Sequence, residues 1–100
     1  MKETNKWLFN STGLPIAFVQ NNDVFTPEGK FIGEVIKNEV FNGKYAGEIV
    51  DDDRLYFNPL KADKFDWHLS LPSMPYIPKT PYSKYFAYLP AGLKDFETAQ

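Results

Sequence analysis

His68 is the only histidine of the chain, and two side chains that could assist it in catalysis lie close to it in the sequence. Asp66 and Ser70 each stand two residues away, on the same face of a strand in which polar and apolar residues alternate. A histidine placed between a carboxylate and a hydroxyl suits a hydrolase that works by acid–base or nucleophilic catalysis. A small hydrolase centred on His68 is therefore one hypothesis. A histidine on the polar face of an edge strand is the structural alternative.

Paired carboxylates are a second source of acid–base chemistry. Glu34 and Glu48 occupy equivalent places in two repeated segments, so they could face each other across neighbouring hairpins. The first repeat has Phe18 at this place, so a pair of carboxylates is not a feature of every repeat. We therefore interpret Glu34 and Glu48 as part of the outward polar face. We therefore predict no catalytic residue and keep the enzyme as an alternative.

Metal and thiol chemistry have little support in the sequence. The chain contains no cysteine, which excludes a thiolate nucleophile and a cysteine metal site. The acidic run at 51–53 lacks the spaced ligands and the terminal glutamate of a calcium loop, so it indicates a solvated turn. We expect neither a metal ion nor a cofactor.

The C-terminal part of the chain is rich in proline and tyrosine. Prolines recur at every third residue from Pro72 to Pro81, which is the repeat of a polyproline II helix. Aromatic residues and a few lysines accompany them, a mixture that could stack single-stranded nucleic acid, although the formal net charge of −2 disfavours this. We expect this extension to dock on its own domain or on a partner chain. The candidate binding residues are Trp67, His68, Tyr76, Tyr82 and Tyr85.

The elements that would position these residues follow from a repeat. One short motif begins near residues 7, 23, 39 and 54, with a period of two in its apolar residues and a turn signal between its arms. This pattern predicts antiparallel hairpins. A glycine in the turn precedes a small residue four positions later, which suits hairpins that meet closely around a common axis. These structural residues are Gly13, Ala17, Gly29, Gly33, Gly43 and Gly47.

Alternation along the second arm of each repeat predicts which side chains face inward. The apolar set, which we assign to the core, is Pro15, Ala17 and Val19, then Phe31, Gly33 and Val35, then Tyr45, Gly47 and Ile49.

The fourth repeat has one arm and needs a partner strand. Residues 65–71 alternate between apolar and polar and could supply it, and a neighbouring chain is the other possibility. We predict an all-β fold of about four pseudo-symmetric antiparallel hairpins around a common axis, with an irregular tail. The hairpin domain covers residues 1–71 and the extension covers 72–100.

The segment from Trp7 to Asn10 and the three glycine steps, two of them followed by Glu-Val or Glu-Ile, resemble the four-fold β-flower domain family. The resemblance covers about residues 7–57. It implies four β-hairpins around a pseudo-fourfold axis in a small bacterial protein. It carries over no activity, because the family has none assigned.

Length and composition indicate the number of domains and the location of the protein. One hundred residues suit a single core, and no apolar run approaches the roughly 18 residues of a membrane span. We therefore expect a cytoplasmic protein that acts as a non-catalytic interaction or self-assembly module. The hydrolase and a weak single-stranded nucleic-acid binder are the alternatives.

Overall fold

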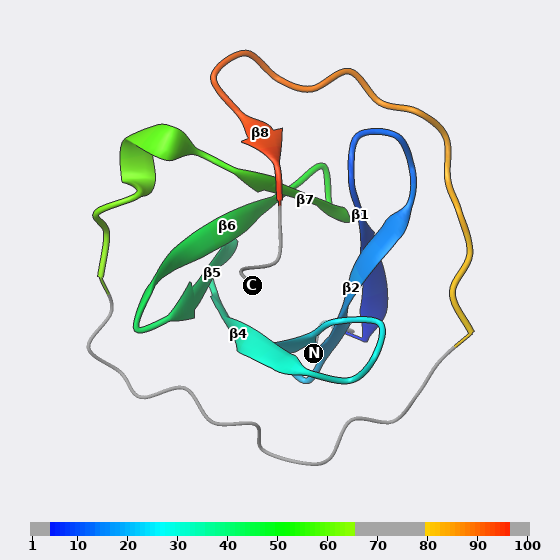
Figure 1. Ribbon diagram of the computed structural model, residues 1–100, viewed down its shortest axis with the longest axis horizontal. Coiled ribbons are helices and arrows are strands. Elements are labelled where there is room, and N and C mark those ends of the chain that lie inside the picture. Colours follow the sequence, from blue (N-terminus) through cyan, green and yellow to red (C-terminus); the bar gives the residue numbers. More distant parts are fainter. Residues whose placement is uncertain (1–4, 66–79, 97–100) are drawn as a thin grey trace.

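Strands make up nearly all the regular structure of this chain. The computed structural model describes residues 5–65 and 80–96 (Figure 1). The elements are β1 (Lys6–Phe9), β2 (Pro15–Gln20), β3 (Asp23–Phe25), β4 (Phe31–Ile36), β5 (Glu39–Asn42), β6 (Lys44–Val50), β7 (Arg54–Phe57), the 3-10 turn η1 (Pro59–Lys61) and β8 (Lys94–Asp95). None of the helices within these residues is long and apolar enough to cross a membrane. The predicted all-β class is confirmed.

Consecutive strands pair antiparallel, and the sheet closes on itself. Phe9 of β1 pairs in parallel with Arg54 of β7, which produces a closed barrel of seven strands. Four complete hairpins would give eight. The difference arises at β7, whose first residue pairs with β1 while its last two pair with the short strand β8.

The partner of β7 comes from a part of the chain that we did not predict. Tyr56 pairs with Asp95 and Phe57 pairs with Lys94, so β8 takes the place for which residues 65–71 or a neighbouring chain were considered. Phe65 instead forms an isolated antiparallel bridge with Lys44 at the start of β6. Residues 66–71 lie outside the described residues, as does the predicted domain boundary at residue 72.

Three hairpins contain the same irregularity. The register shifts between Leu8 and Phe9, between Val24 and Phe25, and between Val40 and Phe41. Each shift is a β-bulge, in which two residues of one strand oppose one residue of the other. The three bulges therefore stand at equivalent places of the repeat.

The bulges change which side chains face the core. Ile16, Ile32 and Ala46 pack against the core cluster, although alternation had assigned them to the outer face. Tyr45 instead stacks against Phe41 and Phe57, which do not belong to that cluster. The predicted burial of Tyr45 is confirmed, since it is 4% exposed, but its ring lies outside the cluster that fills the barrel. Pro15 and Phe31 are half-buried and lie outside that cluster as well, because the extra residue of the bulge reverses the alternation before it.

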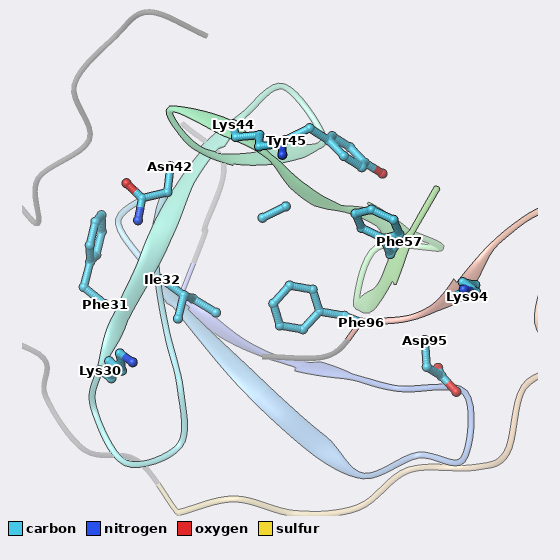
Figure 2. A pocket seen from close by; sticks show the side chains of 11 residues that line it. Lys30, Phe31, Ile32, Asn42, Lys44, Tyr45, Phe57, Lys94, Asp95 and Phe96 are labelled. Carbon is cyan, nitrogen blue, oxygen red and sulfur yellow. The ribbon is translucent and has the colours of Figure 1, made fainter. Parts of the chain in front are cut away.

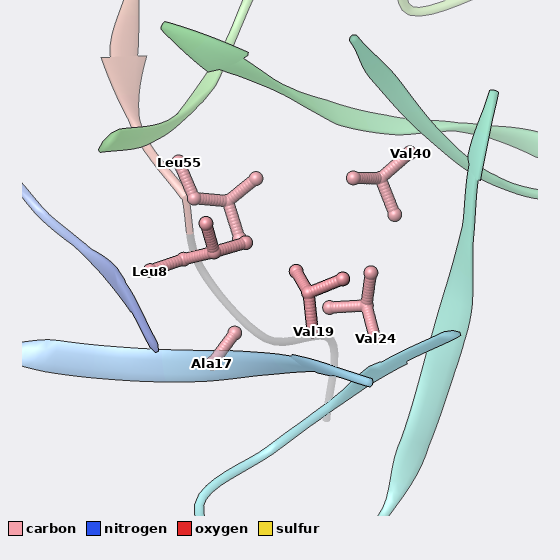
Figure 3. Packing of buried hydrophobic residues seen from close by; sticks show 6 residues of the cluster. All are labelled: Leu8, Ala17, Val19, Val24, Val40 and Leu55. Carbon is pink, nitrogen blue, oxygen red and sulfur yellow. The ribbon is translucent and has the colours of Figure 1, made fainter. Parts of the chain in front are cut away.

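The core fills the interior of the barrel. Figure 3 shows its buried side chains pointing toward one another from strands around the ring. Four of them occupy the same place in successive repeats and are fully buried, namely Leu8, Val24, Val40 and Leu55. Each such side chain contributes about 1.5–3 kcal/mol when it is removed from water. The repeat thus supplies one inward apolar residue from every first arm.

Two glycines allow neighbouring hairpins to approach closely. A Cβ atom at Gly33 would lie 2.7 Å from the carbonyl oxygen of Phe41, and one at Gly47 would lie 2.8 Å from that of Tyr56. Both distances are shorter than real Cβ contacts. The crowding therefore lies between β4 and β5 and between β6 and β7, and each glycine meets the adjacent strand.

The other small residues of the repeat serve turns and the core. Gly29 and Gly43 have φ angles of 96° and 78°, which L side chains rarely adopt. Ala17 is fully buried in the core cluster. Gly13 has both a positive φ of 92° and a close neighbour from the C-terminal part of the chain, the carbonyl group of Lys84.

Candidate functional site

Two of the five predicted binding residues lie in the described part of the chain. Tyr82 and Tyr85 belong to residues 80–93, a segment that we call the strap because it runs along the outside of the barrel before β8 (Figure 1). Trp67, His68 and Tyr76 lie outside the described residues, together with Asp66 and Ser70. The strap is therefore the part of the predicted site that the structure places.

The strap exposes large apolar side chains over a short length of chain. Tyr85 is 87% exposed and Tyr88 is 88% exposed, values at which nearly the whole ring contacts solvent. Phe86 packs edge-on against Tyr88, with ring centroids 5.2 Å apart. We call the exposed set the aromatic strip, and it consists of Tyr82, Tyr85, Phe86, Tyr88 and Leu89. Exposed apolar groups gathered in this way usually mark an interaction surface.

Backbone hydrogen bonds fasten the strap to the turn between β1 and β2. The amide of Lys84 donates to the carbonyl oxygen of Gly13 at 2.8 Å, and the amide of Ala87 donates to that of Ser11 at 2.7 Å. Gly13 also provides the space, because a Cβ atom there would lie 2.1 Å from the carbonyl oxygen of Lys84. The aromatic strip is thus carried by a backbone held in place on both sides of Tyr85.

Arg54 provides a buried anchor beneath the strap. Its guanidinium donates to the carbonyl oxygen of Asn10 at 2.8 Å and to that of Tyr85 at 2.7 Å. Its side chain is 8% exposed, and its Nε atom lies 4.0 Å from a carboxylate oxygen of Asp53. A single side chain of β7 therefore holds the first turn and the strap together.

Further side-chain contacts hold the strap against the barrel and place a carboxylate beside its one charged residue. Lys84 forms an ion pair with Asp53, and its amino group lies 5.4 Å from the centre of the Phe9 ring. Tyr82 packs on the same ring, with centroids 5.2 Å apart. Asp95, just beyond the strap, accepts two hydrogen bonds of 2.7 Å from the amide and hydroxyl of Ser11. Lys84 is the one charged residue of the strap, and it is paired with Asp53.

A second polar cluster lies at the other side of β7, around η1. The amino group of Lys61 lies 2.7 Å from a carboxylate oxygen of Glu39 and 2.8 Å from one of Glu48. The hydroxyl of Tyr45 donates to Glu48 at 2.9 Å and accepts from the amide of Asn58 at 3.0 Å. These contacts fasten η1 and the residue before it to β5 and β6.

The protonation states in this cluster suit structure better than catalysis. Hydrogen bonds from Lys61 and Lys64 lower the pKa of Glu39, and hydrogen bonds to Glu39 and Glu48 raise the pKa of Lys61. Burial raises the pKa of Tyr45, with smaller contributions from the contact with Glu48. Near neutral pH the lysine is charged and the tyrosine is neutral, so neither acts as a nucleophile or base.

The structure does not bring Glu34 and Glu48 together. Strand β5 lies between their strands, and the residues opposite them on it are Phe41 and Glu39, respectively. Glu48 faces Lys61 and Tyr45, as described above. In the part of the chain that is described, no group of three or more His, Cys, Asp or Glu side chains is placed to hold a metal ion.

Sequence reasoning missed Arg54, Phe86 and Tyr88. The repeat treats the place of Arg54 as variable, and the one available signal is that it is the only arginine of the chain. Phe86 and Tyr88 belong to the same aromatic run as Tyr82 and Tyr85, and that run is the signal by which they could have been found. Their exposure becomes visible only once the strap is placed on the barrel.

No protein-family model matches this chain, and no curated protein and no solved structure matches it significantly. The comparisons therefore show no family. The resemblance to the four-fold β-flower domain stays a prediction, and the function rests on the geometry of the strap.

Proposed function

We propose that this chain is a non-catalytic interaction module that assembles with a second copy of itself through the aromatic strip. The observation that carries the proposal is the exposure of Tyr85 and Tyr88 on a hydrogen-bonded backbone. A surface that is already ordered loses little conformational entropy on binding, so more of the contact energy appears as affinity. Tyrosine rings also supply much contact area with few rotatable bonds.

Charge favours a second copy as the occupant. In a two-fold symmetric dimer the same surface patch meets itself, so any net charge on the patch would face its like. The strip avoids this cost because Lys84 is paired with Asp53 and residues 80–93 contain no carboxylate. A different protein partner is the alternative, and it would leave the isolated chain monomeric.

The place of β7 and β8 in the barrel bears on the fold family. We propose that the domain follows the four-fold β-flower plan, with the antiparallel pair of β7 and β8 in place of its fourth hairpin, in a bacterial cytoplasmic protein. Leu55 supports this, because it shares its place in the core with Leu8 and Val24. Phe96, just after β8, packs against the core as Ile16 does just after the start of β2.

The other two functions have less support. The hydrolase depends on His68, which lies outside the described residues, and the pairing of Glu34 with Glu48 is not formed. Nucleic-acid binding needs free cations beside the aromatic rings. The lysine within the strap is already paired with a carboxylate.

Sedimentation velocity tests the proposal. The wild-type chain should show a dimer whose fraction rises with concentration, and the double variant Tyr85→Ser with Tyr88→Ser should remain monomeric. Leu60→Ser is the matched control, because Leu60 is 93% exposed on η1 and lies outside the strip. A wild-type chain that stays monomeric to millimolar concentration would contradict self-assembly.

A further inference from the structure

A hollow of about 680 Å³ opens beside the core, between β4, β6, β7 and β8. Figure 2 shows the side chains that surround it. Its apolar lining includes Ile32, Ala46 and Phe96, which also pack against the core cluster, and Phe57 adds a further ring. The volume lies within the range of about 300–1,000 Å³ that is usual for small-molecule sites.

Three lysines of the described part of the chain line this hollow. The amino groups of Lys30, Lys44 and Lys94 make no hydrogen bond or ion pair with any residue in 5–65 or 80–96. Four other lysines of the same ranges each pair with a carboxylate, namely Lys6, Lys61, Lys64 and Lys84. Figure 2 places the three unpaired lysines on different sides of the opening.

One carboxylate lines the hollow beside the three lysines. Asp95 accepts hydrogen bonds from Ser11 at both of its oxygens and keeps its negative charge, so the described lining carries three positive charges against one negative charge. The hollow therefore combines an apolar floor with an excess of positive charge at its rim. Like charges repel one another, so three unpaired ammonium groups around one opening favour an anion between them.

We propose that this hollow binds an organic anion, formed of an apolar ring or short chain that bears a carboxylate, sulfonate or phosphate group. The apolar part would contact Ile32, Ala46 and Phe96, and the anionic group would lie among the lysines at the rim. Lysine suits this role because its ammonium group pairs with an anion as a point charge from a flexible stem. A cation would be repelled, and a neutral ligand would gain nothing from the lysines.

The site is independent of the proposed self-assembly. None of its lining residues belongs to the aromatic strip, so either proposal can fail while the other stands. The three lysines are exposed, and their replacement by glutamine removes charge without disturbing the core.

The experiment compares two fluorescent probes of similar size, anilinonaphthalene sulfonate, which is anionic, and N-phenyl-1-naphthylamine, which is neutral. Each is titrated into the wild-type chain and into the triple variant Lys30→Gln, Lys44→Gln and Lys94→Gln. Lys37→Gln is the control, because Lys37 is an exposed lysine that does not line the hollow.

The dissociation constant of the anionic probe should rise on the order of tenfold in the triple variant, since each exposed ion pair contributes modestly. It should change less than threefold in the Lys37 control, and that of the neutral probe should change less than threefold in the triple variant. The proposal is overturned if the wild-type chain does not bind the anionic probe. It is also overturned if the dissociation constant of that probe rises less than threefold in the triple variant. A change of threefold or more for the anionic probe in the Lys37 control, or for the neutral probe in the triple variant, would overturn it as well.

Discussion

The guanidinium of Arg54 donates a hydrogen bond of 2.7 Å to the backbone carbonyl of Tyr85, and thereby connects β7 to the strap. A second hydrogen bond from the same group reaches Asn10. The residue that begins the fourth repeat is therefore also the anchor of the strap. A change at Arg54 should therefore affect both the stability of the fold and the position of the aromatic strip.

The substitution Arg54→Lys should loosen the strap. Lysine keeps the charge but has no planar fork, so it cannot reach both carbonyl oxygens in the same geometry. We expect a loss of about 1–3 kcal/mol in the free energy of unfolding, as for a buried hydrogen-bonded group. Hydrogen exchange at the amides of Lys84 and Ala87 should become faster, because the strap opens locally. Lys6→Gln, which removes a surface ion pair, is the control. Unchanged exchange at both strap amides in Arg54→Lys would show that Arg54 is not the anchor.

Gly13→Ala should displace the strap by steric conflict. The added methyl group would lie 2.1 Å from the carbonyl oxygen of Lys84, at a backbone φ of 92°. Gly43→Ala is a matched control, because its φ is 78° and a Cβ atom there meets nothing within 4 Å. Both variants bear the backbone strain of about 1–3 kcal/mol. Faster exchange at Lys84 should appear in Gly13→Ala alone, and equal exchange in the two variants would contradict the close approach.

Leu55→Ala tests the core that fills the barrel. Leu55 is fully buried among Leu8, Val24 and Val40, so its truncation leaves a cavity. We expect a loss of about 2–5 kcal/mol in the free energy of unfolding, measured by urea denaturation. The same change at exposed Leu60 should stay within about 0.5 kcal/mol of wild type. Similar losses at the two positions would be inconsistent with a core inside the barrel.

The contribution of Glu39 to stability should depend on pH. Hydrogen bonds from Lys61 and Lys64 lower its pKa in the folded chain below the usual value of 4.5. A lowered pKa stabilises the folded state above the unfolded pKa, and this stabilisation is lost as pH falls through the folded pKa. The difference in unfolding free energy between wild type and Glu39→Gln should be constant above about pH 5.5 and should shrink below pH 4.5. Urea titrations from pH 7 to pH 3 measure it, and a difference that grows on acidification would refute the contact.

The hairpins and part of the core follow from sequence patterns because both depend on residues close together in the chain. The inward assignment was made for the second arms alone, and it holds for Ala17 and Val19, which are buried in the core cluster. Leu8, Val24, Val40 and Leu55 recur with the repeat, but their shared burial is a finding of the structure. The bulges could not be predicted, because Ile16 and Ala17 are both apolar and either one fits the inward place. A bulge adds a residue without changing the composition, and it reverses the alternation on one side of itself.

The features that the sequence did not predict depend on contacts between distant parts of the chain. Strand β8 has two residues and no alternating pattern, and its pairing with β7 joins distant parts of the chain. The tyrosines of the strap are visible in the sequence, but tyrosine is intermediate between buried and exposed residue types, so their role depends on where the strap lies. Arg54 is likewise identified only by the carbonyl groups that surround it.

Self-assembly through the aromatic strip is the central claim, and contacts between two copies test it most directly. A sample that mixes isotope-labelled and unlabelled chains reports nuclear Overhauser effects between molecules alone. We expect such effects between the ring protons of Tyr85, Phe86 and Tyr88 of one copy and those of the other. Intermolecular effects confined to residues outside the strip, or none at a concentration of about one millimolar, where even a weak dimer of about −4 kcal/mol is half formed, would contradict it.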